Sequence, residues 1–342
     1  MPDGCDIAAG VSPRVLRLTC RGPRWGAVWR WTSPRAGATR TDEDRRAEAR
    51  PGEVEGANDG RPMNVSRLRV LSWDVGVGGH RRLPLIERID ADVLLLLGVS
   101  RQSSQAWSHR WQDRYHCVTG LELATSQQER PRGAMVAARW PLADSSVIEA
   151  LPRPERGLTA TIELDGTTVV LVAWGSPNAA REGFRAKMDA YRHMHHWLQG
   201  LDNPAIVGVN TNSHFDPPDP DAPDEDDELR AAEHAFLARG ASHGLVDVHR
   251  ILVDADPPRR WLLSQLRPAG PLATTYIRRP HGRPRGIAQG FEAGRDFGLD
   301  RMDRLFVSPH LRPLACEHLY HEAIDAGSNH AALIADLELG AG

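Results

Sequence analysis

Four short segments carry polar side chains that could do acid–base or cation chemistry, each at one end of a run that predicts a β-strand. They are residues 72–74, 209–212, 301–304 and 328–330. Carboxylates such as Asp74 and Asp303 can hold a hard cation, and the imidazole of His330 can exchange a proton or meet an anion. Asn210 cannot act as a base, because an amide oxygen is too weakly basic to accept a proton at neutral pH.

Three other patterns favour structural interpretations. His193 and His196 share a face of a predicted helix with His195 nearby, but no carboxylate stands at ligand spacing, so this group indicates a solvated helix surface. The glycines of 76–79 lack the spacing of a dinucleotide fingerprint. The four cysteines show no CxxC or zinc-ligand spacing, which is typical of reduced thiols in a cytoplasmic protein.

The composition is that of a soluble globular protein, with 41% hydrophobic and 25% charged residues. A formal net charge of -3 over 342 residues does not indicate a generally basic surface for gripping nucleic acid. No apolar run approaches the roughly 18 residues that a membrane span needs, and the N-terminus has no apolar signal-peptide segment. We therefore expect a cytoplasmic protein.

Residues 1–65 differ from the rest of the chain. They are rich in Arg, Gly, Ala, Pro and Asp and have little apolar periodicity, so they cannot bury enough apolar surface to offset chain entropy. We expect a disordered tail here. An alternative is that translation begins at Met63, immediately before the first convincing strand, and intact-mass measurement of native protein would decide between the two.

From Leu68 onward, apolar runs alternate with helical periodicity, and Asp165-Gly166 is a strong hairpin signal. The expected strands are 68–75, 92–100, 133–142, 158–166, 167–174, 203–210, 301–309 and 331–339. The expected helices are 83–91, 181–201 and 229–240, and 244–250 reads as a short strand or turn. Hairpins mixed with strand–helix–strand units predict an α/β fold of the α+β type, in one domain of residues 66–342.

Two charged stretches flank the predicted site. The acidic, Pro-rich stretch 216–228 follows directly on Asn212, and a basic stretch covers 278–285. The first could bind cations or repel nucleic acid, and the second could contact a phosphate or an acidic partner. For both, a solvated surface loop is the favoured interpretation.

Taken in order, the strand-end motifs resemble those of the endonuclease/exonuclease/phosphatase superfamily over residues 68–339. The six motifs are Ser72-Trp73-Asp74, Leu97-Gly98-Val99, Trp174-Gly175-Ser176, Val209-Asn210-Thr211-Asn212, Arg301-Met302-Asp303-Arg304 and Ser328-Asn329-His330. The resemblance implies a four-layer sandwich of two mixed β-sheets flanked by helices. It also implies Mg²⁺-dependent cleavage of phosphodiesters or phosphomonoesters.

The departures from this family pattern fall at chemically active positions. Gly98 stands where the family has a metal-ligand Glu, Asn210 where it has the water-activating Asp, and Gly175 where it has a phosphate-contacting His. Asn329 offers a neutral amide in place of an Asp. Asp74 replaces an Asn, so one carboxylate is gained at the same cluster.

Other parts of the family pattern remain. By resemblance, His330 is a phosphate-binding residue, Asp303 orients it, and Asn212 orients phosphate; Asn329 and Arg304 are assigned to substrate binding. A carboxylate beside an imidazole favours the charged imidazolium, which suits an anionic ligand. Asp74 is the candidate metal ligand, and with Asp303 it would make a poor copy of the family's Mg²⁺ site.

Two hypotheses follow. In the favoured one, the protein is catalytically degenerate and binds a phosphate-bearing small molecule or a protein partner in the former active-site cleft. The alternative is an active Mg²⁺-dependent phosphoesterase whose metal site is rebuilt around Asp74. The acidic stretch and the near-neutral net charge disfavour duplex nucleic acid as a partner in either case.

Overall fold

The computed structural model describes residues 67–76, 79–125, 131–213, 228–256 and 301–340. All of them belong to one compact unit, Arg61–Gly342. The expected disordered tail of residues 1–65, the alternative start at Met63, the acidic residues 216–227 and the basic stretch 278–285 lie outside the described residues.

The first sheet has six strands in the order β11-β12-β1-β2-β4-β3. The strands are β1 (Arg67–Asp74), β2 (Val93–Ser100), β3 (His116–Thr119), β4 (Arg132–Ala138), β11 (Leu311–Leu319) and β12 (Ala332–Leu339). β1 and β2 run parallel, and their neighbours pair antiparallel. The sheet is mixed, as expected.

The second sheet also has six strands, in the order β5-β6-β7-β8-β10-β9. The strands are β5 (Ala143–Val147), β6 (Gly157–Leu164), β7 (Thr167–Gly175), β8 (Ala205–Asn210), β9 (Val246–Asp247) and β10 (Asp303–Val307). Only β7 and β8 pair in parallel. In each sheet the parallel pair therefore brings two carboxyl strand ends to the same edge, which is where the polar motifs lie.

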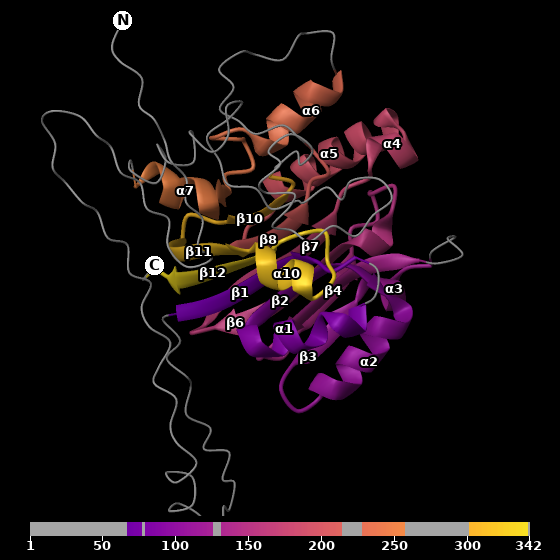
Figure 1. Cartoon of the computed structure of the whole chain (residues 1–342). Helices are drawn as coiled ribbons and strands as arrows, with labels where there is room; N and C mark the ends of the chain where they lie inside the picture. Colours follow the sequence, from indigo (N-terminus) through magenta and orange to yellow (C-terminus); the bar gives the residue numbers. More distant parts are fainter. Residues whose placement is uncertain (1–66, 77–78, 126–130, 214–227, 257–300, 341–342) are drawn as a thin grey trace, which may run out of the picture. The chain divides into compact units, whose positions relative to one another are not determined.

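Helices cover the outer faces of both sheets (Figure 1). The first sheet carries α1 (Leu83–Ile89), α2 (Arg101–Trp111) and α10 (Tyr320–Asp325), and the second carries α5 (Phe184–Gln199) and α6 (Glu228–Leu237). Shorter elements are η1 (Gly79–Arg81), α3 (Gly120–Leu123), η2 (Pro154–Arg156), α4 (Ala179–Glu182) and α7 (Val248–Asp254). None of the described helices has the length and apolar character needed to cross a membrane. The four-layer sandwich of the sequence analysis is confirmed.

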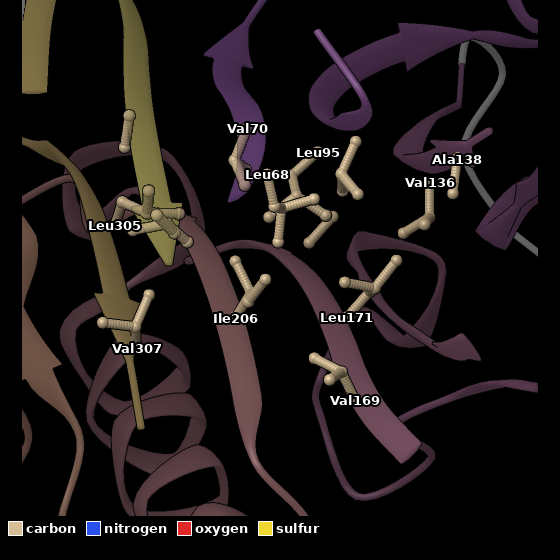
Figure 2. Close-up of a cluster of buried hydrophobic side chains, with 14 of the residues drawn as sticks. Leu68, Val70, Leu95, Val136, Ala138, Val169, Leu171, Ile206, Leu305 and Val307 are labelled. Atoms are coloured by element: carbon tan, nitrogen blue, oxygen red, sulfur yellow. The ribbon is translucent and has the colours of Figure 1, made fainter. Parts of the chain in front are cut away.

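The main core lies between the two sheets (Figure 2). Side chains alternate along each strand, so Val93, Leu95 and Leu97 of β2 face the second sheet while Leu94 and Leu96 face the outer helices. This double burial explains the near-continuous apolar run of β2. Glycine at position 208 allows the two sheets to approach closely, because a Cβ there would lie 2.5 Å from Ser72 Oγ.

The expected hairpin is confirmed, since Asp165 and Gly166 both have positive φ, at 49° and 78°. The long helix predicted over 181–201 is instead two helices, α4 and α5. The break falls at Gly183, whose φ of 92° interrupts the helical backbone. His193 and His196 are exposed on α5, in agreement with a solvated helix surface. His195 departs from that prediction, because it is half-buried and its Nε2 lies 2.9 Å from Ser242 Oγ.

Candidate functional site

A cavity of about 320 Å³ opens at the edge of the sandwich where β1, β2, β7 and β8 end. Seven of the predicted site residues line it: Asp74, Gly98, Gly175, Asn210, Asn212, Asn329 and His330. The structure therefore brings together motifs that are spread over more than two hundred residues of sequence. An eighth, Asp303, lies behind the lining and contacts His330.

Asp74 occupies the space next to Gly98 at the ends of β1 and β2. Gly98 has a φ of 68°, and a Cβ there would lie 2.7 Å from Asp74 Oδ1 and 3.2 Å from the backbone nitrogen of Gly76. The β2–β4 register shifts between Leu96 and Val99, which places Gly98 in an irregular stretch of the strand. A side chain at position 98 is therefore disfavoured both by the backbone conformation and by the carboxylate of Asp74.

Gly175 differs from Gly98 in this respect. A Cβ at Gly175 would meet no atom within 4 Å, and the residue lines the cavity. A larger side chain would fit there. The positive φ of the backbone thus favours glycine at position 98, whereas at position 175 glycine simply leaves open space in the cavity.

Both oxygens of Asp74 accept hydrogen bonds. The backbone N–H of Gly76 donates to Oδ1 at 3.0 Å, and Nδ2 of Asn210 donates to Oδ2 at 2.7 Å. The other end of the Asn210 amide, Oδ1, accepts from the backbone N–H of Asn212 at 2.9 Å. These partners fix the amide orientation, so Asn210 acts as a buried donor to Asp74 and a turn former, not as a base.

Asn212 is held in the left-handed region, with a φ of 48°. Its side-chain nitrogen donates to the Ser176 carbonyl at 2.8 Å, and its own carbonyl accepts from Lys187 Nζ at 2.8 Å. Lys187 also pairs with Glu233 at 2.6 Å, and both side chains are buried. A buried ion pair between α5 and α6 therefore supports the loop that carries Asn212.

His330 and Asp303 form the predicted pair. Nδ1 of His330 lies 2.7 Å from Asp303 Oδ2, and Nε2 lies 4.0 Å from Asp74 Oδ2. Burial disfavours the charged imidazole, but the negative charges of Asp303 and Asp74 outweigh it and raise the pKa of His330 to about 9. His330 is therefore an imidazolium at neutral pH, and it lies at the wall of the cavity.

Ser328 sets the position of His330. Its hydroxyl donates to the Asp74 carbonyl at 3.0 Å and accepts from the backbone N–H of His330 at 3.0 Å. The indole N–H of Trp73 donates to the His330 carbonyl at 3.0 Å. The end of β1 and the loop before β12 are thus joined by hydrogen bonds, which holds the imidazole in one place.

Arg304 does not join the other predicted site residues. It is fully buried on β10, with Nη1 3.6 Å from Asp247 Oδ2, and it is not part of the cavity wall. Arg301 lies closer to the same carboxylate, at 2.6 Å. The substrate-binding role expected for Arg304 does not fit this position, because β10 turns the side chain toward β9 and α7.

Three arginines that were not predicted from the sequence also line the cavity: Arg132, Arg156 and Arg181. Arg156 pairs with Glu182 at 2.8 Å. Arg132 and Arg181 make no side-chain ion pair with any residue that the structure describes. Arginine alone is a weak signal in a chain with 42 Lys and Arg residues, so only the fold could identify these three.

The charge balance of the cavity wall is positive among the described residues. The cations are the three arginines and the His330 imidazolium, and the carboxylates are Asp74 and Glu182. Burial opposes ionisation of Glu182, but the charge of Arg156 outweighs it and lowers its pKa. An anion entering this cavity would meet cations whose charge is only partly neutralised.

No protein-family model matches the sequence, and no curated protein sequence does so either. Solved structures do match. An AP endonuclease from Archaeoglobus fulgidus aligns with a TM-score of 0.53 at 20% identity, over 78% of this chain and 98% of that one. TDP2 from D. rerio, solved with a single strand DNA product, aligns with a TM-score of 0.53 at 15% identity, over 80% of this chain and all of that one.

A third solved structure is an endonuclease/exonuclease/phosphatase protein from Beutenbergia cavernae DSM 12333. It aligns with a TM-score of 0.50 at 17% identity, over 81% of this chain and 72% of that one. At such identities the likeness concerns the fold. The chain has the endonuclease/exonuclease/phosphatase fold, as the strand-end motifs predicted.

Proposed function

We propose that the cavity binds a phosphate-bearing ligand directly through its cationic side chains, and that the chain does not hydrolyse this ligand with Mg²⁺. The observation that carries the proposal is the positive cavity wall, formed by Arg132, Arg156, Arg181 and the His330 imidazolium. Arginine matches phosphate with its planar fork of donors. An imidazolium held by Asp303 adds a fixed donor on the same wall.

The described residues do not fit a resident Mg²⁺ ion. Mg²⁺ is usually held by one or two carboxylates together with phosphate oxygens and water. Here the wall offers Asp74, whose two oxygens each already accept a hydrogen bond. The other carboxylate, Glu182, is paired with Arg153 and Arg156. The remaining charged groups of the wall are cations and repel a metal ion.

The fold also supports a phosphate ligand. The D. rerio TDP2 structure, which has a similar fold, contains a single strand DNA product, and DNA carries phosphate groups. For this chain, the cavity volume of about 320 Å³ suits a small phosphate ester or one terminal phosphate. The net charge of -3 does not favour a long duplex.

The alternative function is an active Mg²⁺-dependent phosphoesterase with a rebuilt site. One observation favours it: Asp74, Asn212, Asn329 and His330 line a single cavity. Gly98, Asn210 and Gly175 nevertheless stand where the family resemblance implies a metal ligand, a base and a phosphate contact. Without those groups, the site lacks the means to polarise the phosphoryl oxygens and activate water.

Calorimetric titration separates the two functions. The full chain is titrated with inorganic phosphate and with a nucleoside 5′-monophosphate, first in a chelator and then in millimolar Mg²⁺. We expect binding in the chelator that Mg²⁺ does not strengthen, and no release of phosphate from the ester. Hydrolysis of the ester that the chelator abolishes would favour the alternative function. If neither phosphate nor the nucleotide binds, the proposed phosphate site is wrong and a protein partner becomes the favoured ligand of the cavity.

The Arg132→Gln variant localises the binding. Because a hydrogen bond between charged groups contributes about 1.5–3 kcal/mol, Kd should rise about tenfold or more. The matched control is Arg67→Gln, since Arg67 is 73% exposed and begins the strand whose other end is Asp74. It should bind phosphate as the wild type does. Equal affinity in both variants would contradict the proposal.

A further inference from the structure

A second cluster of chemically capable side chains lies outside the cavity, where α7 packs on β11. It consists of His249, Cys316 and His318, and we refer to it as the His–Cys–His cluster. One ring nitrogen from each histidine and the Cys316 sulfur all lie within 4.8 Å of one another. Figure 1 shows α7 above β10 and β11, at the side of the sandwich away from the helices α1 and α2.

The strand geometry explains why the cluster forms. Cys316 and His318 are two residues apart on β11, so their side chains point to the same face. Their partners on β12 are Ala335 and Leu333, both members of the core between the sheets. That face is covered at this edge by α7, whose first turn carries His249.

The start of α7 is fixed independently. Asp247 is its N-cap and accepts from the backbone N–H of Arg250 at 3.2 Å. The same carboxylate accepts from Arg301 at 2.8 Å. These bonds hold the first turn of α7 against β10, so His249 has a defined place opposite β11. The two imidazole rings lie edge to face, with centroids 4.8 Å apart.

We propose that the His–Cys–His cluster is a binding site for Zn²⁺. Two imidazoles and a thiolate are the ligand types that Zn²⁺ takes and that Mg²⁺ does not. His249 and Cys316 are buried and His318 is half-buried. A tetrahedral Zn²⁺ separates its ligand atoms by about 3.3–3.8 Å, so side-chain rotations of modest size would close the present spacing. The fourth position would take water or a further ligand.

The site would join the two sheets at their edges. β11 is the edge strand of the first sheet, and β9, which leads directly into α7, is the edge strand of the second. A metal bound to both would link elements far apart in sequence. Because a metal that binds only the folded state stabilises it, Zn²⁺ should raise the melting temperature.

Cobalt substitution tests the site in the full chain. After chelator treatment and removal of the chelator, Co²⁺ is titrated under reducing conditions and the visible and near-ultraviolet spectrum is followed. We expect one equivalent of Co²⁺ to give a thiolate-to-metal charge-transfer band and tetrahedral visible bands, both displaced by Zn²⁺. The Cys316→Ser and His318→Gln variants should lose the charge-transfer band and the tetrahedral bands, respectively.

The control is Cys117→Ser, because Cys117 lies on β3, at the opposite edge of the same sheet. It should keep the full spectrum. Circular dichroism and the melting temperature without metal establish that each variant folds. If Cys316→Ser does not fold, His318→Gln, whose side chain is half-buried, tests the site instead. The proposal is overturned if the wild type gives no thiolate band, or if the band survives in Cys316→Ser. A rise in melting temperature with Zn²⁺ that persists in both variants would also overturn it.

Discussion

A Cβ at Gly98 would lie 2.7 Å from Oδ1 of Asp74, so a side chain at position 98 and the carboxylate in its present place exclude each other. Gly98 has the left-handed conformation, and the Asp74 carboxylate fills the space beside it, anchored by Gly76 and Asn210. The missing side chain at position 98 and the carboxylate at position 74 are therefore structurally coupled.

The coupling is measurable in a double-mutant cycle. Gly98→Ala should lower the free energy of unfolding by about 1–3 kcal/mol, because it adds left-handed strain and the contact with Asp74. Asp74→Ala removes the contacting oxygen, so Gly98→Ala should lower the free energy of unfolding by less in that background. The part that remains is due to the strained φ of position 98. Denaturant unfolding of the four proteins gives the coupling. Strict additivity would show that the two positions are independent.

His330 should make stability depend on pH in a defined window. Its pKa is raised to about 9 in the folded protein, against about 6.5 for an unperturbed imidazole. A raised pKa stabilises fully below the unfolded value, and this contribution disappears as pH rises through the folded value. The stability of the wild type relative to His330→Gln should therefore fall between about pH 6.5 and 9, by roughly 3 kcal/mol.

Chemical denaturation of both proteins at several pH values measures this difference, since the other histidines are common to both. NMR titration of the His330 ring provides an independent reading. A ring that titrates near its ordinary pKa would contradict the electrostatic role assigned to Asp303 and Asp74.

The sequence was sufficient for the central strands and insufficient for less regular elements. β2 and β8 are apolar on both faces and were predicted close to their observed bounds. α2 was missed because its buried face uses only Ser104, Trp107 and Trp111 in an otherwise polar segment. β11 was missed because Pro313 and a register shift interrupt its alternation.

The site was predictable where strand-end motifs carry it. The family resemblance implied the pairing of His330 with Asp303, and the places of Asp74, Asn210 and Asn212 at strand ends implied that they converge. The cavity arginines and the Asp74–Gly98 contact depend on side-chain positions at an irregular strand end, which periodicity does not encode. The same holds for the burial of Arg304, which faces Asp247 instead of the cavity.

The buried pair of Lys187 and Glu233 should be a major determinant of stability. Lys187→Met leaves Glu233 buried without its cation and removes the donor to the Asn212 carbonyl. We expect a loss of about 3–5 kcal/mol. The double variant Lys187→Met/Glu233→Leu should recover much of that loss, because no uncompensated charge remains. Unfolding of the three proteins in urea provides the comparison, and a double variant as unstable as Lys187→Met would show that the Asn212 contact dominates.

Asn210→Asp should convert the cavity from one that repels a divalent cation to one that attracts it. Nδ2 of Asn210 now donates to Asp74 Oδ2 at 2.7 Å. A carboxylate in its place would put two negative groups at that distance, so one of them should hold a proton at an abnormally high pKa and the variant should be destabilised at neutral pH. A hard cation placed between the two carboxylates would relieve this repulsion. Millimolar Mg²⁺ should therefore raise the melting temperature of Asn210→Asp while leaving that of the wild type unchanged.

The control is Asn203→Asp, at an exposed position just before the opposite end of β8. This variant should respond to Mg²⁺ as the wild type does. If Mg²⁺ stabilises the wild type as much as Asn210→Asp, the cavity already holds a cation and the metal-independent mode of phosphate binding proposed above is wrong.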